Sequence, residues 1–168
     1  PAPSDLDGLD IVIADIQDIG ARYYTYAYTI GMMMDACGAQ GIEVWVLDRP
    51  NPINGTAVEG NVVEPYYESF VGMQPLANRH GMTLGELARF FERFGGWECE
   101  YDVIEMQGWT RSLWFDQTDL PWVMPSPNMP TLDTATVYPG QCLLEGTNSS
   151  EARGTTRPFE LFGAPYVD

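Results

Sequence analysis

VWVLDRPNPINGTAVEG, residues 44–60, is the stretch from which the fold of this chain is predicted. Its first four residues are apolar, and a run this short predicts a buried strand. Pro50 and Pro52 prevent the strand from continuing, because proline lacks a backbone N–H and fixes φ. The following loop begins with Asp48 and Arg49, and ligands bind at such strand ends in open α/β sheets. A surface turn set by the prolines and by Asn-Gly is the alternative.

The neighbouring segments predict a βαβ unit. Residues 10–14 predict a strand, residues 22–40 a buried helix in spite of Gly31, and residues 43–47 the next strand. Two strands joined by a helix in this way lie parallel. We therefore expect an α/β fold with a parallel sheet.

The second half of the chain is less regular. Residues 61–78 show no period and predict a long surface loop, which is typical of lids and binding loops. Residues 84–94 predict a helix that Thr83 and Glu86 begin as a capping box, so a cap is the simpler role for Glu86. We expect a strand at 97–106, and a helix from residue 131 that Pro139 and Gly140 interrupt.

Composition narrows the class of protein. The chain has 168 residues, 45% of them apolar, which is enough for one domain with a sizeable core. Its 24 acidic residues and eight arginines, with no lysine, give a net charge of −16. This charge argues against binding to nucleic acid or to an anionic membrane. No apolar run approaches the length that inserts into a bilayer.

Several kinds of chemistry have no basis in this sequence. It contains no G-x-S-x-G, Walker A or G-x-G-x-x-G motif, and without lysine it has no Schiff base. Cys37, Cys99 and Cys142 are isolated and are expected to be small buried hydrophobes. We expect neither a metal nor a cofactor, and the sequence leaves the oligomeric state open. Carboxylates, amides, arginines and aromatic rings remain, and these suit a sugar ligand and glycosidic cleavage.

The motifs taken together carry a family resemblance. They are DIQDIGARYYTY (15–26), LDRPNPING (47–55), VEG (58–60), RHGMTLGEL (79–87), PSPNMP (125–130), LEGTN (144–148) and RGTT (153–156). In this order they closely resemble the bacterial exo-β-N-acetylmuramidases, a family long known only as a domain of unknown function. The resemblance spans nearly the whole chain.

The resemblance implies a fold and an activity. It implies a glycoside hydrolase that removes N-acetylmuramic acid from the non-reducing ends of peptidoglycan fragments. It also implies a Rossmann-like domain with a parallel sheet and flanking helices, leading into a smaller C-terminal domain, with the site in the cleft between them. We assign residues 1–125 to the first domain and residues 126–168 to cleft loops and the start of the connection.

The resemblance further implies that family members are longer at both ends. We therefore expect this chain to be an internal fragment, with the Rossmann-like domain incomplete at its N-terminus and most of the C-terminal domain absent. The main catalytic acid is then expected to lie outside the chain, which alone would be inactive. The parent protein is expected to be exported.

Candidate site residues follow from the polar loops and the resemblance. As catalytic groups we predict Asp18 and Glu59, as a base or as a stabiliser of an oxocarbenium-like transition state. Arginines in loops are predicted to bind the lactyl carboxylate of muramic acid, since a guanidinium fits a carboxylate. The predicted saccharide-binding residues are Asp15, Arg22, Tyr24, Tyr26, Asp48, Arg49, Asn51, Arg79, His80, Asn128, Glu145, Asn148, Glu151 and Arg153.

Simpler roles exist for several of these residues. Asp15 can cap the following helix, Glu145 and Glu151 can pair with Arg153 or Arg157, and the tyrosines can belong to the core. For the whole protein, the alternative is a carbohydrate-binding or cell-wall-binding module that keeps the sugar-facing loops without catalysis. A nucleotide-dependent Rossmann enzyme is a weaker alternative, because no glycine fingerprint is present.

Overall fold

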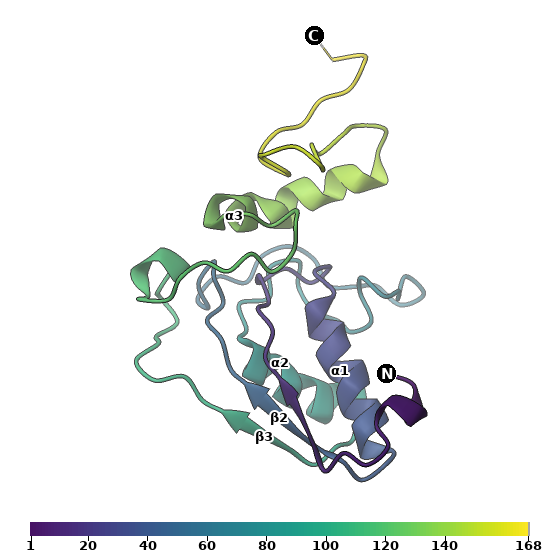
Figure 1. Cartoon of the computed structure of the whole chain (residues 1–168). Coiled ribbons are helices and arrows are strands. Elements are labelled where there is room, and N and C mark those ends of the chain that lie inside the picture. The colour runs from purple at the N-terminus through teal and green to yellow at the C-terminus, as the bar shows by residue number, and fades with distance from the viewer. Residues whose placement is uncertain (168) are drawn as a thin grey trace.

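The computed structural model, which describes residues 1–167, contains a parallel three-stranded sheet in the order β1-β2-β3 (Figure 1). The strands are β1 (Ile11–Ala14), β2 (Glu43–Leu47) and β3 (Tyr101–Ile104). The predicted α/β class with a parallel sheet is confirmed. β3 is shorter than the predicted strand at 97–106.

Of the three α-helices within residues 1–167, α1 (Tyr26–Gly38) and α2 (Leu84–Phe90) cover one face of this sheet. Helix α2 continues as a π-helical turn over Phe91–Gly95, and the third helix is α3 (Leu132–Gln141). Short 3-10 turns lie at Pro3–Asp5, Phe115–Gln117 and Cys142–Gly146. Among residues 1–167, no helix is both long and apolar enough to cross a membrane.

The main core lies between the sheet and helices α1 and α2, which stand side by side in Figure 1. Val44 and Val46 of β2 point into it and are fully buried, as are Leu87 and Phe91. On the opposite face of the sheet, Ile13 is 59% exposed, because successive side chains of a strand alternate between faces.

A second core joins the loop after β1 to α3 and the C-terminal segment, which lie beyond one end of the sheet (Figure 1). Tyr23 and Tyr24 pack on Tyr138 of α3, with ring centroids 5.9 Å apart in each case. This packing explains why α1 begins at Tyr26 and not at the predicted Arg22. Tyr23 and Tyr24 precede the helix and belong to the second core.

The prediction that Pro139 and Gly140 interrupt the third helix was wrong. Pro139 lies inside α3, which runs on to Gln141 before tightening into a 3-10 turn. The carbonyl of Pro139 accepts a hydrogen bond from the Tyr23 hydroxyl, so the second core holds this last turn in place.

Candidate functional site

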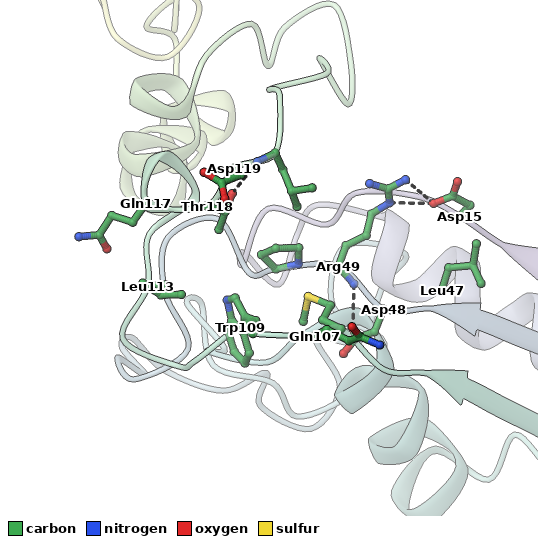
Figure 2. A pocket seen from close by; sticks show the side chains of 14 residues that line it. Asp15, Leu47, Asp48, Arg49, Gln107, Trp109, Leu113, Gln117, Thr118 and Asp119 are labelled. Carbon is green, nitrogen blue, oxygen red and sulfur yellow. Dashed lines mark hydrogen bonds and ion pairs between the residues drawn. The ribbon is translucent and has the colours of Figure 1, made fainter.

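A crevice of about 580 Å³ lies at the carboxyl ends of all three strands (Figure 2). Asp15 follows β1, Asp48 and Arg49 follow β2, and Gln107 and Trp109 follow β3. Residues 117–120 close one side. This is the position in which open α/β sheets bind ligands, and it brings together three of the predicted site residues.

Arg49 and Asp15 form an ion pair across the mouth of the crevice (Figure 2). The Nε atom of Arg49 donates to Oδ1 of Asp15 over 2.7 Å, and the two side chains are 38% and 48% exposed. An exposed pair of this kind contributes little to stability, about 0–1 kcal/mol. Both groups can therefore exchange their mutual contact for contacts with a polar ligand.

Asp48 holds the sheet and helix α2 together. Its Oδ1 accepts from the backbone N–H of Gly85 (2.8 Å) and of Arg49 (3.0 Å), and its Oδ2 accepts from the hydroxyl of Thr83 (3.0 Å). Burial raises the pKa of Asp48, and these hydrogen bonds oppose that shift. Both carboxylate oxygens are occupied, so the geometry favours an anchoring role for Asp48.

The predicted capping box at the start of α2 is confirmed. The Thr83 hydroxyl accepts from the backbone N–H of Glu86 (3.3 Å), and the Glu86 carboxylate accepts from the backbone N–H of Thr83 (3.0 Å). Glu86 also pairs with Arg111, which donates to the carbonyls of Gly55 and Gly81. The loops that border the crevice are thus tied to the helix.

Asp18, which is predicted from the sequence to be a catalytic group, does not face the crevice. It is 4% exposed, and its Oδ2 accepts from the backbone N–H of Gly20 (2.7 Å) and lies 3.2 Å from Nε2 of His80. His80 is 3% exposed, and its Nδ1 accepts from the backbone N–H of Met82 (3.1 Å). The turn at Gly20, with φ +83°, directs Asp18 inward.

Asn51 is also part of the scaffold in this geometry. It is 1% exposed, its amide nitrogen donates to the carbonyl of Met82 (3.0 Å), and its amide oxygen accepts from the backbone N–H of Ile53 (3.2 Å). The amide therefore shapes the loop after β2, and the predicted contact of Asn51 with a hydroxyl finds no support here. The same holds for His80.

Glu59 and Arg79 pair on a different wall. The two side chains are 65% and 15% exposed, and Nη1 of Arg79 donates to the Glu59 carboxylate over 2.7 Å. Arg79 also donates to the carbonyl of Ile53, and its guanidinium lies 5.6 Å from the ring centroid of Trp114. The pair lines a cavity of about 550 Å³ against α3.

Tyr24 and Tyr26 line a third cavity, of about 620 Å³, between the loop after β1 and the C-terminal segment. Their rings pack with centroids 4.8 Å apart, and the Tyr26 hydroxyl donates to the carbonyl of Pro125 (2.6 Å). The Tyr24 hydroxyl is buried and has no hydrogen-bond partner among the described residues. Burial raises the pKa of Tyr24, so this phenol stays protonated and remains able to donate.

The C-terminal loops contribute one arginine to this third cavity. Arg153 donates to Glu145 (Nε to Oε1, 2.8 Å) and lies 3.2 Å from Glu151, which is the simpler pairing considered for these carboxylates. Asn128 accepts from the backbone N–H of Gly154 (3.2 Å). Asn148, also predicted, accepts from the hydroxyl of Tyr166 (2.6 Å).

Arg22 lies under the long loop that precedes α2. Its Nη1 donates to the carbonyls of Asn61 (2.7 Å) and Leu76 (2.9 Å). It lines a cavity of about 310 Å³ formed mainly by residues 61–72. The predicted surface loop at 61–78 thus has a polar anchor beneath it.

The crevice, the tyrosine-lined cavity and the Arg22 cavity are neighbours along one series of shared wall residues, whereas the cavity of Glu59 and Arg79 has none of its described lining residues in common with them. The crevice and a cavity of about 320 Å³ share Asp15, Arg49 and Leu120. That cavity shares Tyr26 with the tyrosine-lined cavity, which in turn shares Tyr23 and Val71 with the Arg22 cavity. Within residues 1–167, no three His, Cys, Asp or Glu side chains gather to hold a metal ion.

Several residues of the crevice wall are not among the site residues predicted from the sequence. Gln107 and Trp109 were recognisable as polar and aromatic groups after a strand, although they were not among the predicted site residues. The segment 117–120 gave no signal, because it is irregular and reaches the crevice only through the path of the chain. Its Asp119 is exposed at the rim (Figure 2).

Comparison with known proteins gives consistent matches along the chain. The model "Exo-beta-N-acetylmuramidase NamZ, N-terminal" matches residues 1–133, and the corresponding C-terminal model matches residues 136–168. The peptidoglycan beta-N-acetylmuramidase NamZ of Bacillus subtilis is 51% identical over 167 residues, which are 99% of this chain and 40% of that protein. The chain thus spans about two fifths of this curated relative.

Two solved structures have the same fold. Both are crystal structures of DUF1343 family proteins from Bacteroides fragilis, each 40% identical to this chain. For the first, the TM-score is 0.93, and the matched region is 100% of this chain and 44% of the Bacteroides fragilis chain. For the second, the TM-score is 0.88, and the matched region is 98% of this chain and 46% of the Bacteroides fragilis chain. The predicted domain boundary at residue 125 stays a prediction.

Proposed function

Because this chain belongs to the exo-β-N-acetylmuramidase NamZ family, we propose that its protein releases N-acetylmuramic acid from the non-reducing ends of peptidoglycan fragments. The observation that carries the proposal is the extent of the family match. Identity of 51% extends over 99% of the chain, and so includes the loops that line the cavities as well as the core.

The adjoining cavities suit a saccharide of more than one ring. Their walls offer a guanidinium and a carboxylate at Arg49 and Asp15, an indole at Trp109 and phenols at Tyr24 and Tyr26. The hydroxyl and amide groups of a sugar can hydrogen-bond to the guanidinium and the carboxylate. The apolar faces of sugar rings can pack on the indole and phenol rings.

Glycosidic cleavage needs a pair of carboxyl groups beside the scissile bond. Of the two predicted catalytic residues, Glu59 is the better placed, since its side chain is 65% exposed at a cavity wall, whereas Asp18 is buried. In this proposal Glu59, paired with Arg79, acts as a base or as a stabiliser of positive charge. Action outside the cytoplasm, where peptidoglycan lies, belongs to the same proposal.

The test is hydrolysis by the complete product of the gene that encodes these residues. The substrates are a chromogenic N-acetylmuramide and the matching N-acetylglucosaminide. We expect release from the muramide and little from the glucosaminide. Release from neither, or only from the glucosaminide, contradicts the proposal.

A non-catalytic saccharide-binding module is the second candidate. The observation in its favour is that Asp18, one of the two predicted catalytic carboxylates, is buried beside His80. Calorimetric titration with N-acetylmuramic acid separates the two candidates. Binding by a gene product that hydrolyses neither chromogenic substrate favours the module, whereas hydrolysis of the muramide excludes it.

A further inference from the structure

The arginines of this chain differ in whether a carboxylate neutralises them. Six of the eight form ion pairs with Asp or Glu, and among residues 1–167 the two that form none are Arg22 and Arg93. Arg93 is exposed, with its guanidinium 5.3 Å from the ring centroid of Phe94. Arg22 is half-buried. In a chain of net charge −16, a half-buried cation without a counter-ion requires an explanation.

Arg22 is held firmly by neutral groups. Its backbone N–H donates to the carbonyl of Asn78 (2.8 Å), and its Nη1 donates to two more backbone carbonyls in the loop after Gly60. The Nε atom is buried and has no partner among the described residues. Its guanidinium also lies 5.9 Å from the ring centroid of Tyr23. The guanidinium is therefore held in position, while part of its donor capacity has no partner and its charge has no carboxylate counter-ion among the described residues.

This charge faces a cavity. Arg22, Tyr67 and Ser69 line the space of about 310 Å³ beneath residues 61–72. Glu64 lines the same space without pairing with Arg22. This cavity and the tyrosine-lined cavity share Tyr23 and Val71 in their walls, so the two are neighbours.

We propose that Arg22 binds the carboxylate of an acidic sugar whose ring lies in the neighbouring cavity beside Tyr24 and Tyr26. This inference rests on the proposed function, and it identifies the arginine that binds the lactyl carboxylate of muramic acid. Arg49, Arg79 and Arg153 are poorer candidates, because each already contacts a carboxylate. The arriving carboxylate provides the counter-ion that Arg22 lacks.

The experiment compares two arginines and two ligands. Arg22→Gln removes the proposed contact, and Arg93→Gln is the matched control, since it removes the other unpaired arginine. Calorimetric titration of the complete gene product uses N-acetylmuramic acid and its methyl ester, which differ only in the charge of the carboxyl group. We expect the wild type and Arg93→Gln to bind the acid at least tenfold more tightly than the ester, and Arg22→Gln to bind both equally.

The ester keeps the test valid if Arg22→Gln disturbs the loop, because the ligand change leaves the protein intact. Equal binding of acid and ester by the wild type overturns the assignment of a carboxylate site. A preference for the acid that survives in Arg22→Gln assigns that site to another residue and overturns the inference for Arg22. Either result leaves the proposed function standing if the chromogenic muramide is hydrolysed, so the two failures are distinguishable.

Discussion

The Nε2 atom of His80 lies 3.2 Å from Oδ2 of Asp18, and both side chains are almost completely buried. The contact joins the loop after β1 to the loop before α2. Nδ1 of His80 accepts from the backbone N–H of Met82, which leaves Nε2 as the ring nitrogen that carries a hydrogen and faces the carboxylate. A short path thus links two loops that are far apart in sequence.

Removal of the imidazole tests how much this path contributes to stability. His80→Ala leaves the Met82 N–H without its acceptor and removes the ring beside Asp18, whose Oδ2 keeps the hydrogen bond from Gly20, and we expect the free energy of unfolding to fall by about 2–4 kcal/mol. His80→Asn is the matched variant, because its side-chain oxygen can still accept from Met82, and it should lose about half as much. Urea denaturation measures both. Equal losses would mean that the Met82 hydrogen bond is unimportant.

We predict that the substitution of glycine by alanine has opposite effects on the free energy of unfolding at Gly31 and at Gly140. Both lie within α-helices, but a Cβ at Gly31 would lie 2.0 Å from Cζ3 of Trp97, whereas nothing lies within 4 Å at Gly140. Gly31→Ala should lower the free energy of unfolding by about 1–3 kcal/mol through overpacking. Gly140→Ala should raise it by about 0.4–1 kcal/mol, since alanine favours the helix. Thermal unfolding checks the two signs, and a stabilised Gly31→Ala would contradict the packing.

The Gly31 position also shows what the sequence can predict and where prediction ends. The helix was predictable because apolar residues and closing glycines surround position 31. The reason for the glycine was not, because Trp97 belongs to a segment predicted as strand and packs on α1 only through the tertiary fold. Likewise, the spacing of Thr83 and Glu86 predicted the capping box, which depends on local contacts alone.

For the candidate site, the sequence indicated the positions of polar groups but not their directions. Asp15 and Asp18 follow the same strand, yet Asp15 lies at the crevice and Asp18 is buried. The direction of the Asp18 side chain depends on the turn at Gly20. A Cβ added at this glycine would lie 2.5 Å from Oδ1 of Asn51, so a larger residue does not fit there. Ion pairs between distant segments, such as Arg79 with Glu59, were also beyond prediction. These pairs determine which arginines remain without a carboxylate partner.

Glu160 gives a prediction for acid conditions. Hydrogen bonds from the Thr134 hydroxyl (2.8 Å) and from Arg157 (Nε, 2.9 Å) lower the pKa of this carboxyl in the folded state. A lowered folded-state pKa stabilises the fold above the unfolded value, near 4.5, and the contribution is lost as pH falls through the folded value. Glu160→Gln should therefore cost about 1 kcal/mol at pH 7 and progressively less below pH 4.5.

The control for Glu160 is Glu105→Gln, which removes an exposed ion pair with Arg89. We expect this variant to differ from the wild type by no more than about 0.5 kcal/mol at pH 7. Denaturant titrations between pH 3 and pH 7 measure both variants. A loss at Glu160→Gln that stays constant over this range would show that the carboxyl does not act through its ionisation.

Arg49 and Arg89 test whether the crevice at the strand ends belongs to the substrate site. Each forms one exposed ion pair, with Asp15 and Glu105 respectively, so Arg49→Gln and Arg89→Gln should each change stability by less than about 1 kcal/mol. Only Arg49 lines the crevice. If a sugar hydroxyl or amide binds there, Arg49→Gln should lower kcat/KM of the complete gene product on muramic-acid-containing saccharides about tenfold, which corresponds to one lost charge-assisted hydrogen bond. Arg89→Gln should leave it unchanged. Wild-type kcat/KM in both variants would place the substrate elsewhere along the adjoining cavities, because a guanidinium at the mouth of an occupied crevice cannot be removed without effect on binding.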